Sequence, residues 1–133
     1  TLLFAPGCQV AVLHQLSFVA GIALFDAVNG VAGLALKWPN DLLAHGVKLA
    51  GILVESTSLG GQVIAVVGVG VNVGSAPVVP GRRTTSLRDR GLEVSAPLLL
   101  DRLATRMAQW IDVWDRGAGF ASIRMEWLRR SIA

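Results

Sequence analysis

The stretch "KLAGILVESTSLGGQVIAVVGVGVNV", residues 48–73, decides the fold because it reads as two long strands joined by a short loop. We expect the first strand over residues 48–56, a turn over 57–61 and the second strand over 62–74. Two strands joined by a short glycine-containing loop pair antiparallel. The sequence therefore predicts an antiparallel hairpin.

The second strand has two unlike faces, because successive side chains of a strand point to opposite sides. The face that begins with Val63 is wholly apolar, and the other face ends in Gly68, Gly70 and Asn72. Glycine weakens a strand and brings no side chain to pack. Two explanations stay open: a ligand lies close against the backbone there, or the strand is bulged or sharply twisted.

The upstream half of the chain supplies further strands and a helix. Residues 1–6 read as the end of a strand, and residues 15–28 are apolar nearly all round, which favours a buried helix that ends at Asn29-Gly30. Residues 33–38 alternate weakly and predict a strand that breaks at Pro39. Residues 39–46 are expected to form a turn with a short connection.

The downstream half is a long connection followed by helices. Residues 74–95 are rich in Pro, Gly and Arg, and so long a connection is often functional. Ser95 is a good N-cap for an amphipathic helix that ends near Trp114, and residues 120–133 predict a shorter helix. Strands and helices are mixed and neighbouring strands antiparallel, so we expect one α+β domain over residues 1–133.

Composition excludes several classes of protein. The chain has 133 residues, of which 53% are hydrophobic and 16% charged, so it is not disordered. All ten arginines lie at or after Arg82 and form no dense stripe, so we expect no nucleic-acid partner. Residues 1–25 carry no charged side chain, but Pro6, Gly7 and several polar residues interrupt them, which favours buried core over a membrane span. Cys8 is the single cysteine, and a cytoplasmic protein is expected.

The two lysines of the chain, Lys37 and Lys48, both fall near the Asn40-Asp41 turn, whereas every other cation is an arginine. A compact ammonium can move between oxygens and stabilise negative charge that develops on a phosphate or carboxylate. Solvated lysines and an ordinary turn are the alternatives. No phosphate-binding loop and no dinucleotide fingerprint is present. The residues alone therefore indicate a small anionic or nucleotide ligand on a sheet.

Three motifs carry a family resemblance. "KWPND" at residues 37–41, "KLAGILVE" at 48–55 and "GVGVNV" at 68–73 resemble, in order and spacing, the catalytic domain of biotin protein ligases, and "TTSL" at 84–87 is also similar. The resemblance covers essentially the whole chain. It implies a mixed, largely antiparallel sheet packed against helices, of the biotin/lipoate ligase type related to class II synthetases.

The resemblance also implies a two-step activity. Biotin and magnesium ATP would give biotinyl-adenylate and pyrophosphate, and the adenylate would then acylate a lysine of the biotin carboxyl carrier domain of a biotin-dependent carboxylase. ATP and Mg²⁺ are the implied cofactors, and biotin is the implied substrate. Whether the protein forms a homodimer stays open.

Six residues take roles from the resemblance. Lys48 would be the catalytic lysine that contacts the biotin carboxylate and the α-phosphate, and Gly51 would lie close to biotin. The nucleotide side would be formed by Trp38, Asn40, Asp41 and Asn72. No metal ligand is assigned, and Lys37 is left without a role.

Two family features are missing from residues 1–133: the glycine- and arginine-rich loop that closes over biotin, and the small C-terminal SH3-like barrel. That loop excludes water from a hydrolysable adenylate. We therefore expect this partial catalytic domain to be inactive, or nearly so, by itself. The alternatives are a lipoate ligase-type acyl-adenylating enzyme and a non-catalytic ligand-binding or dimerisation fragment.

Overall fold

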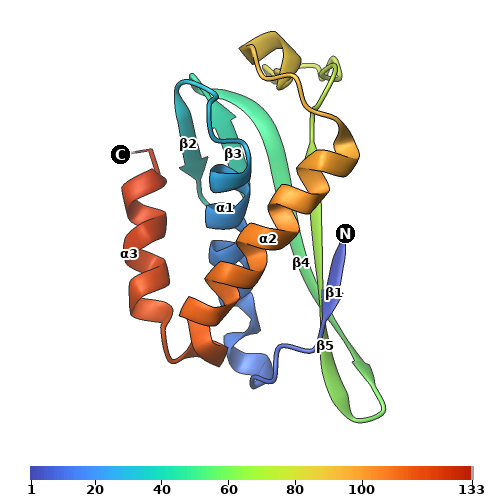
Figure 1. Ribbon diagram of the computed structural model, residues 1–133, viewed down its shortest axis with the longest axis vertical. Coiled ribbons are helices and arrows are strands. Elements are labelled where there is room, and N and C mark those ends of the chain that lie inside the picture. Colours follow the sequence, from blue (N-terminus) through green and yellow to red (C-terminus); the bar gives the residue numbers. More distant parts are fainter. Residues whose placement is uncertain (133) are drawn as a thin grey trace.

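A computed structural model describes residues 1–132 and contains one five-stranded sheet, ordered β1-β5-β4-β3-β2, in which every neighbouring pair is antiparallel. Its strands are β1 (Leu2–Phe4), β2 (Leu34–Lys37), β3 (Asp41–Ala44), β4 (Val47–Leu59) and β5 (Gln62–Val71). Its helices are α1 (Leu16–Ala27), α2 (Ala96–Trp114) and α3 (Phe120–Arg130), which lie together over the sheet (Figure 1). The predicted α+β class is confirmed.

The hairpin β4–β5 is the longest pairing in the sheet and runs from Ala50 opposite Val71 to Leu59 opposite Gln62. Only Gly60 and Gly61 form its turn, and their φ angles are 59° and 77°. Left-handed residues at both central positions suit the two-residue turn that matches strand twist. The prediction of a turn over residues 57–61 was therefore wrong, because two glycines are enough to reverse the chain.

The segment 39–46 corrects a second prediction. Instead of a turn and a connection it contains β3, which pairs with β2 on one side and with β4 on the other. Leu42 and Ala44 are fully buried, so the segment contributes to the core. The reversal into β4 needs only His45 and Gly46, whose φ angles are 49° and 73°.

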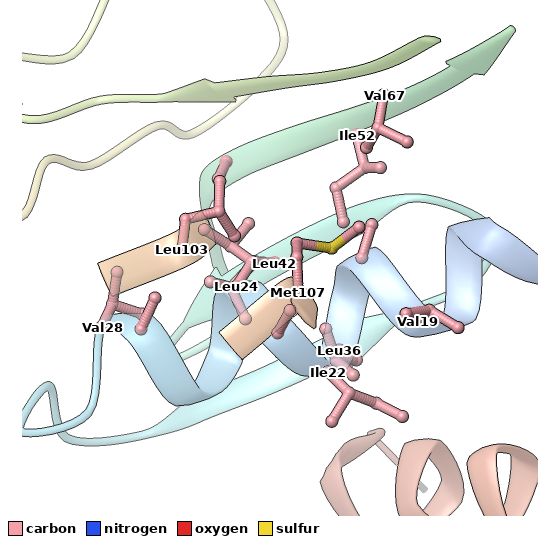
Figure 2. Packing of buried hydrophobic residues seen from close by; sticks show 14 of the residues in the cluster. Val19, Ile22, Leu24, Val28, Leu36, Leu42, Ile52, Val67, Leu103 and Met107 are labelled. Carbon is pink, nitrogen blue, oxygen red and sulfur yellow. The ribbon is translucent and has the colours of Figure 1, made fainter. Parts of the chain in front are cut away.

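Helix α1 is the centre of the core, as predicted. Val19, Ile22 and Leu24 are fully buried, and the helix contacts α2, α3 and strands β2, β3 and β4 (Figure 2). By length and composition alone, residues 10–27 qualify as a membrane-spanning helix near the N-terminus. Half of that window is buried inside the fold. Helix α1 is apolar except at Ser17 and Asp26, as expected of a helix that its neighbours cover on most sides.

Helices α2 and α3 are fastened to α1 by polar contacts. Asp26 of α1 accepts a hydrogen bond from the Trp110 indole at 2.8 Å and pairs with Arg130 of α3 at 3.2 Å. The side-chain hydrogen bond from Arg130 lowers the pKa of Glu126. Helix α2 begins as predicted, because the Ser95 hydroxyl accepts from the Leu98 amide at 3.3 Å.

Trp114 tests the packing between α2 and the N-terminal segment. Its side chain is fully buried, and its indole donates to Gln15 at 2.8 Å. Trp114→Ala should lower the free energy of unfolding by about 3–5 kcal/mol, because it leaves a cavity and an unpaired amide. Val113→Ala, on the exposed side of the same helix, should change it by less than about 0.5 kcal/mol. Urea denaturation followed by circular dichroism measures both, and equal effects would contradict this packing.

Candidate active site

The sheet register places four residues of interest in one row. Lys37 of β2 lies opposite Asp41 of β3, Asp41 lies opposite Gly51 of β4, and Gly51 lies opposite Gly70 of β5. Directly opposite residues of antiparallel strands project from the same face. This row lies on the face turned away from the helices, since the next row, from Leu42, faces the core. Two charged side chains therefore stand beside two positions that have no side chain.

Lys48 reaches the same face because of a β-bulge. The pairing shifts between Leu42 opposite Ala50 and Leu43 opposite Lys48, so Leu49 is an extra residue in β4. In a regular strand, residues three positions apart point to opposite faces, and the extra residue reverses this for Lys48 and Gly51. A Cβ atom placed on Gly51 would lie 3.5 Å from the Lys48 ammonium nitrogen. The lysine therefore lies over the glycine.

Lys48 and Asp41 form an ion pair at this point. The Lys48 Nζ atom lies 2.6 Å from Asp41 Oδ1, and the two side chains are 34% and 23% exposed. Asp41 Oδ1 itself is buried and accepts no well-aligned hydrogen bond from the described residues. The Nζ–Oδ1 distance is short, but the geometry is not that of an aligned hydrogen bond, so the contact is an ion pair. An ammonium held by one carboxylate keeps donors for a second anion.

The glycine face of β5 is open. A Cβ atom at Gly70 would meet nothing within 4 Å, and one at Gly68 would meet only Leu53, at ordinary contact distance. Both glycines pair regularly with β4, without a register shift. The explanation of these glycines by a bulge in β5 is therefore wrong. Packing does not exclude side chains here, so their absence leaves an open surface beside Lys48. We call this surface, formed by Gly51, Gly68 and Gly70, the floor of the site.

Asn40 and Asn72 hold the strands around this floor. The Asn40 side-chain nitrogen donates to the Ile52 carbonyl at 2.9 Å, and the Asn72 side-chain nitrogen donates to the Thr85 carbonyl at 2.9 Å. One N–H of each side-chain amide is thus used within the protein, and no hydrogen bond is described for either side-chain oxygen within residues 1–132.

Trp38 is not brought to this floor. Its ring centroid lies 5.4 Å from that of Phe18 in α1 and 6.4 Å from that of Trp127 in α3. These contacts account for Trp38 as an aromatic residue packed beside the helices, although 61% of it is exposed. The predicted nucleotide contact of Trp38 has no support from this geometry and stays a prediction.

Thr85 is the residue that sequence reasoning left without a role. It is 3% exposed, and its amide donates to the Lys48 carbonyl at 2.9 Å. The Arg83 carbonyl accepts from the Lys48 amide at 3.3 Å, so residues 83–85 run beside the start of β4. The similarity of "TTSL" to the family indicated that this segment matters, but it did not predict the hydrogen bonds to Lys48.

Comparisons with known proteins identify the family. Residues 4–72 match the model of the biotin/lipoate A/B protein ligase family, and the chain belongs to this family. It is 43% identical over 142 residues to a biotin–[acetyl-CoA-carboxylase] ligase of Paracoccus denitrificans, covering 98% of the chain and 59% of that protein. A ligase of the same name from Mycobacterium tuberculosis is 43% identical over 105 residues, which cover 71% of the chain and 38% of that protein.

Solved structures agree on the fold. A biotin protein ligase from Aquifex aeolicus in complex with biotin and ATP superposes with a TM-score of 0.76 at 23% identity, covering 98% of the chain and 56% of that structure. The apo form of the Aquifex ligase gives a TM-score of 0.78. The chain therefore has the fold of this catalytic domain, and it spans less than two thirds of the length of each of these relatives.

The ion pair makes a prediction about stability. Lys48→Met removes the ammonium beside the buried Asp41 oxygen and should lower the free energy of unfolding by about 1–2 kcal/mol. The double variant Lys48→Met/Asp41→Asn should recover part of this, because a neutral amide needs no counterion. Urea denaturation of the wild type, Lys48→Met, Asp41→Asn and the double variant completes a double-mutant cycle. Strictly additive effects would contradict direct coupling of the two side chains.

Proposed function

We propose that the protein containing this chain joins biotin to a biotin carboxyl carrier domain in two ATP-dependent steps. The observation that carries the proposal is the Lys48 ammonium, placed over Gly51 on an open sheet face and held by a single carboxylate. The names of the relatives from Paracoccus and Mycobacterium support biotin as the substrate and a carboxylase as the acceptor.

In the first step an oxygen of the biotin carboxylate attacks the α-phosphate of ATP. The bond between the α- and β-phosphates breaks, and pyrophosphate leaves with the electron pair. Negative charge builds on the α-phosphate oxygens in the transition state. The Lys48 ammonium, which already pairs with one carboxylate, offsets this charge and brings two anions together.

In the second step the neutral amine of a carrier lysine attacks the carbonyl carbon of the biotinyl-adenylate. An amide bond forms, AMP leaves with the electron pair of the broken acyl–phosphate bond, and the amine loses a proton. The exposed face around Gly70 suits this step, since the carrier lysine must reach the adenylate from solvent. Gly51 would lie next to biotin, and the side-chain oxygens of Asn40 and Asn72 would face the nucleotide, as would Trp38 if it turns from its present contacts.

Magnesium fits the site only together with the nucleotide. Among residues 1–132 no group of three or more His, Cys, Asp or Glu side chains could hold a metal. Mg²⁺ is commonly bound through one or two carboxylates plus substrate phosphates. The Asp41 carboxylate is the group that would join such a set, through its second oxygen, because Oδ1 is buried against the Lys48 ammonium. The ion would neutralise charge on the phosphates.

Other properties of the whole protein are also proposals. A cytoplasmic location follows from the proposed partner, a metabolic carboxylase. Nothing in residues 1–132 favours a nucleic-acid partner or a homodimer. The family model covers both biotin and lipoate ligases, and the named relatives favour biotin. A non-catalytic role for the whole protein would leave the Lys48 arrangement without a task.

Lys48→Met tests the chemistry directly. In the whole protein, the rate of biotin-dependent ATP–pyrophosphate exchange should fall by about 100-fold or more, because a major charge-stabilising group is lost. Lipoate should not replace biotin in the wild-type assay. Arg124→Met, an exposed cation on α3, is the matched control and should keep the wild-type rate. An unchanged rate in Lys48→Met would exclude the proposed role of this lysine.

Gly70→Ala tests the floor of the site. The added methyl group meets no protein atom, and a compatible Gly→Ala change raises the free energy of unfolding by about 0.4–1 kcal/mol through the unfolded state. The same methyl group should raise the KM for biotin or ATP, because it occupies ligand space. Thermal denaturation and exchange kinetics separate these two effects. Glu55→Ala, farther along the same face of β4, is the control, and a wild-type KM in Gly70→Ala would mean that no ligand lies there.

A further inference from the structure

We propose that Arg90 is a positioning residue for the adenylation step: it holds Thr85, and through Thr85 it fixes the backbone from which Lys48 projects. The Arg90 Nε atom donates to the Thr85 hydroxyl at 2.8 Å. The inference rests on the proposed function, since it concerns the same lysine. Thr85 bonds to the Lys48 backbone and Arg90 bonds to Thr85, so Arg90 would act on the lysine only through Thr85.

The first step of the argument is that β4 changes its neighbour at Lys48. From Leu59 to Ala50 the strand pairs with β5, and the Asn72 amide still donates to the Leu49 carbonyl at 3.1 Å. At Lys48 the hydrogen bonds on that edge go instead to Arg83 and Thr85. The strand is bulged at the same point, and although Lys48 still lies opposite Leu43 of β3, its own backbone N–H and C=O bond to residues 83–85.

The second step is that Thr85 is the buried end of an exposed connection. Residues 77–83 are all exposed, and burial resumes at Thr85. Thr85 uses three groups: its amide donates to the Lys48 carbonyl, its carbonyl accepts from the Asn72 side chain, and its hydroxyl accepts from Arg90. It thus joins the start of β4, the end of β5 and the Arg88–Arg90 turn.

The third step concerns Arg90 itself. It is half-buried, it ends a short 3-10 turn, and within residues 1–132 no carboxylate pairs with it. Its described side-chain bond is the one to Thr85. A hydrogen bond from a charged donor is stronger than one between neutral groups. The described role of the Arg90 guanidinium is therefore its hydrogen bond to the Thr85 hydroxyl, and not an ion pair with a carboxylate.

The consequence is kinetic. A shift of about 1 Å in a catalytic group can cost up to about 100-fold in rate, even when the changed residue lies away from the chemistry. Because Lys48 acts on charge that develops in the transition state, loosening it should lower kcat more than it raises KM. A residue that only stabilises the fold would lower the amount of folded protein and leave both constants of the folded fraction unchanged.

The test compares Thr85→Val, Thr85→Ser and Arg90→Met in the whole protein, with Arg124→Met as the matched control. In biotin-dependent ATP–pyrophosphate exchange, Thr85→Val and Arg90→Met should each lower kcat by about tenfold. Thr85→Ser keeps the acceptor oxygen and should retain the wild-type kcat. The double variant Thr85→Val/Arg90→Met should be no slower than either single variant, because one bond is removed in all three.

Amide hydrogen exchange supplies a readout that does not depend on activity. The Lys48 and Thr85 amides should lose protection in Arg90→Met and keep it in Arg124→Met. Unchanged kcat and unchanged protection in Arg90→Met would overturn the positioning role, as would a Thr85→Ser enzyme as slow as Thr85→Val. If the wild-type protein shows no biotin-dependent exchange, the proposed function fails. Retained amide protection in Arg90→Met would separately show that the Arg90–Thr85 hydrogen bond does not hold the Lys48 backbone.

Discussion

The candidate site depends on one extra residue in β4. Leu49 and Ala50 follow each other in sequence and are both buried, which regular alternation does not allow for a strand with one covered face. The bulge at Leu49 lets both contribute to the core and turns Lys48 to the opposite face. In a regular strand Lys48 would point toward the helices, where an unpaired ammonium is costly. The same irregularity therefore protects the core and places the cation on the open face.

The open face is organised around this lysine by residues of two kinds. Gly51 and Gly70 contribute an absence of side chains, which leaves backbone at the surface beside the ammonium. Asn40 and Asn72 contribute hydrogen bonds that hold neighbouring segments to β4 and β5. Within "KWPND", Asn40 makes a structural hydrogen bond to β4, and Trp38 packs against helices α1 and α3.

Much of the fold could be predicted because its signals are local. The two faces of β5, the buried and nearly all-apolar α1 and the Ser95 cap each follow from a short pattern, and each is confirmed. Strand β3 was missed because four residues between turn-forming neighbours show no period. Strand β3 forms because Leu42 packs in the core, and this tertiary contact cannot be read from four residues of sequence.

The site was predicted less completely for the same reason. Lys48, Asp41 and Gly51 were identified by family resemblance, but no sequence pattern shows that they meet on one face, because the bulge depends on how Leu49 packs. The link from Arg90 through Thr85 to Lys48 could not be predicted from a sequence pattern either. It joins Arg90 to Lys48 across a connection whose middle is exposed, and neither residue type is unusual in a loop.

The described arginines and lysines of this chain make different kinds of contact. Arg90 and Arg130 make fixed, directed bonds, to a buried hydroxyl and to two carboxylates, which suits a planar guanidinium. Lys37 and Lys48 instead lie on the open face on either side of Asp41, which is opposite Lys37 in register and paired with Lys48. A guanidinium is larger than an ammonium and would extend over the floor at Gly51, where the Lys48 nitrogen already lies within contact distance of a Cβ position. A compact cation leaves more of the surface over Gly51 open than a guanidinium would, which favours lysine at position 48.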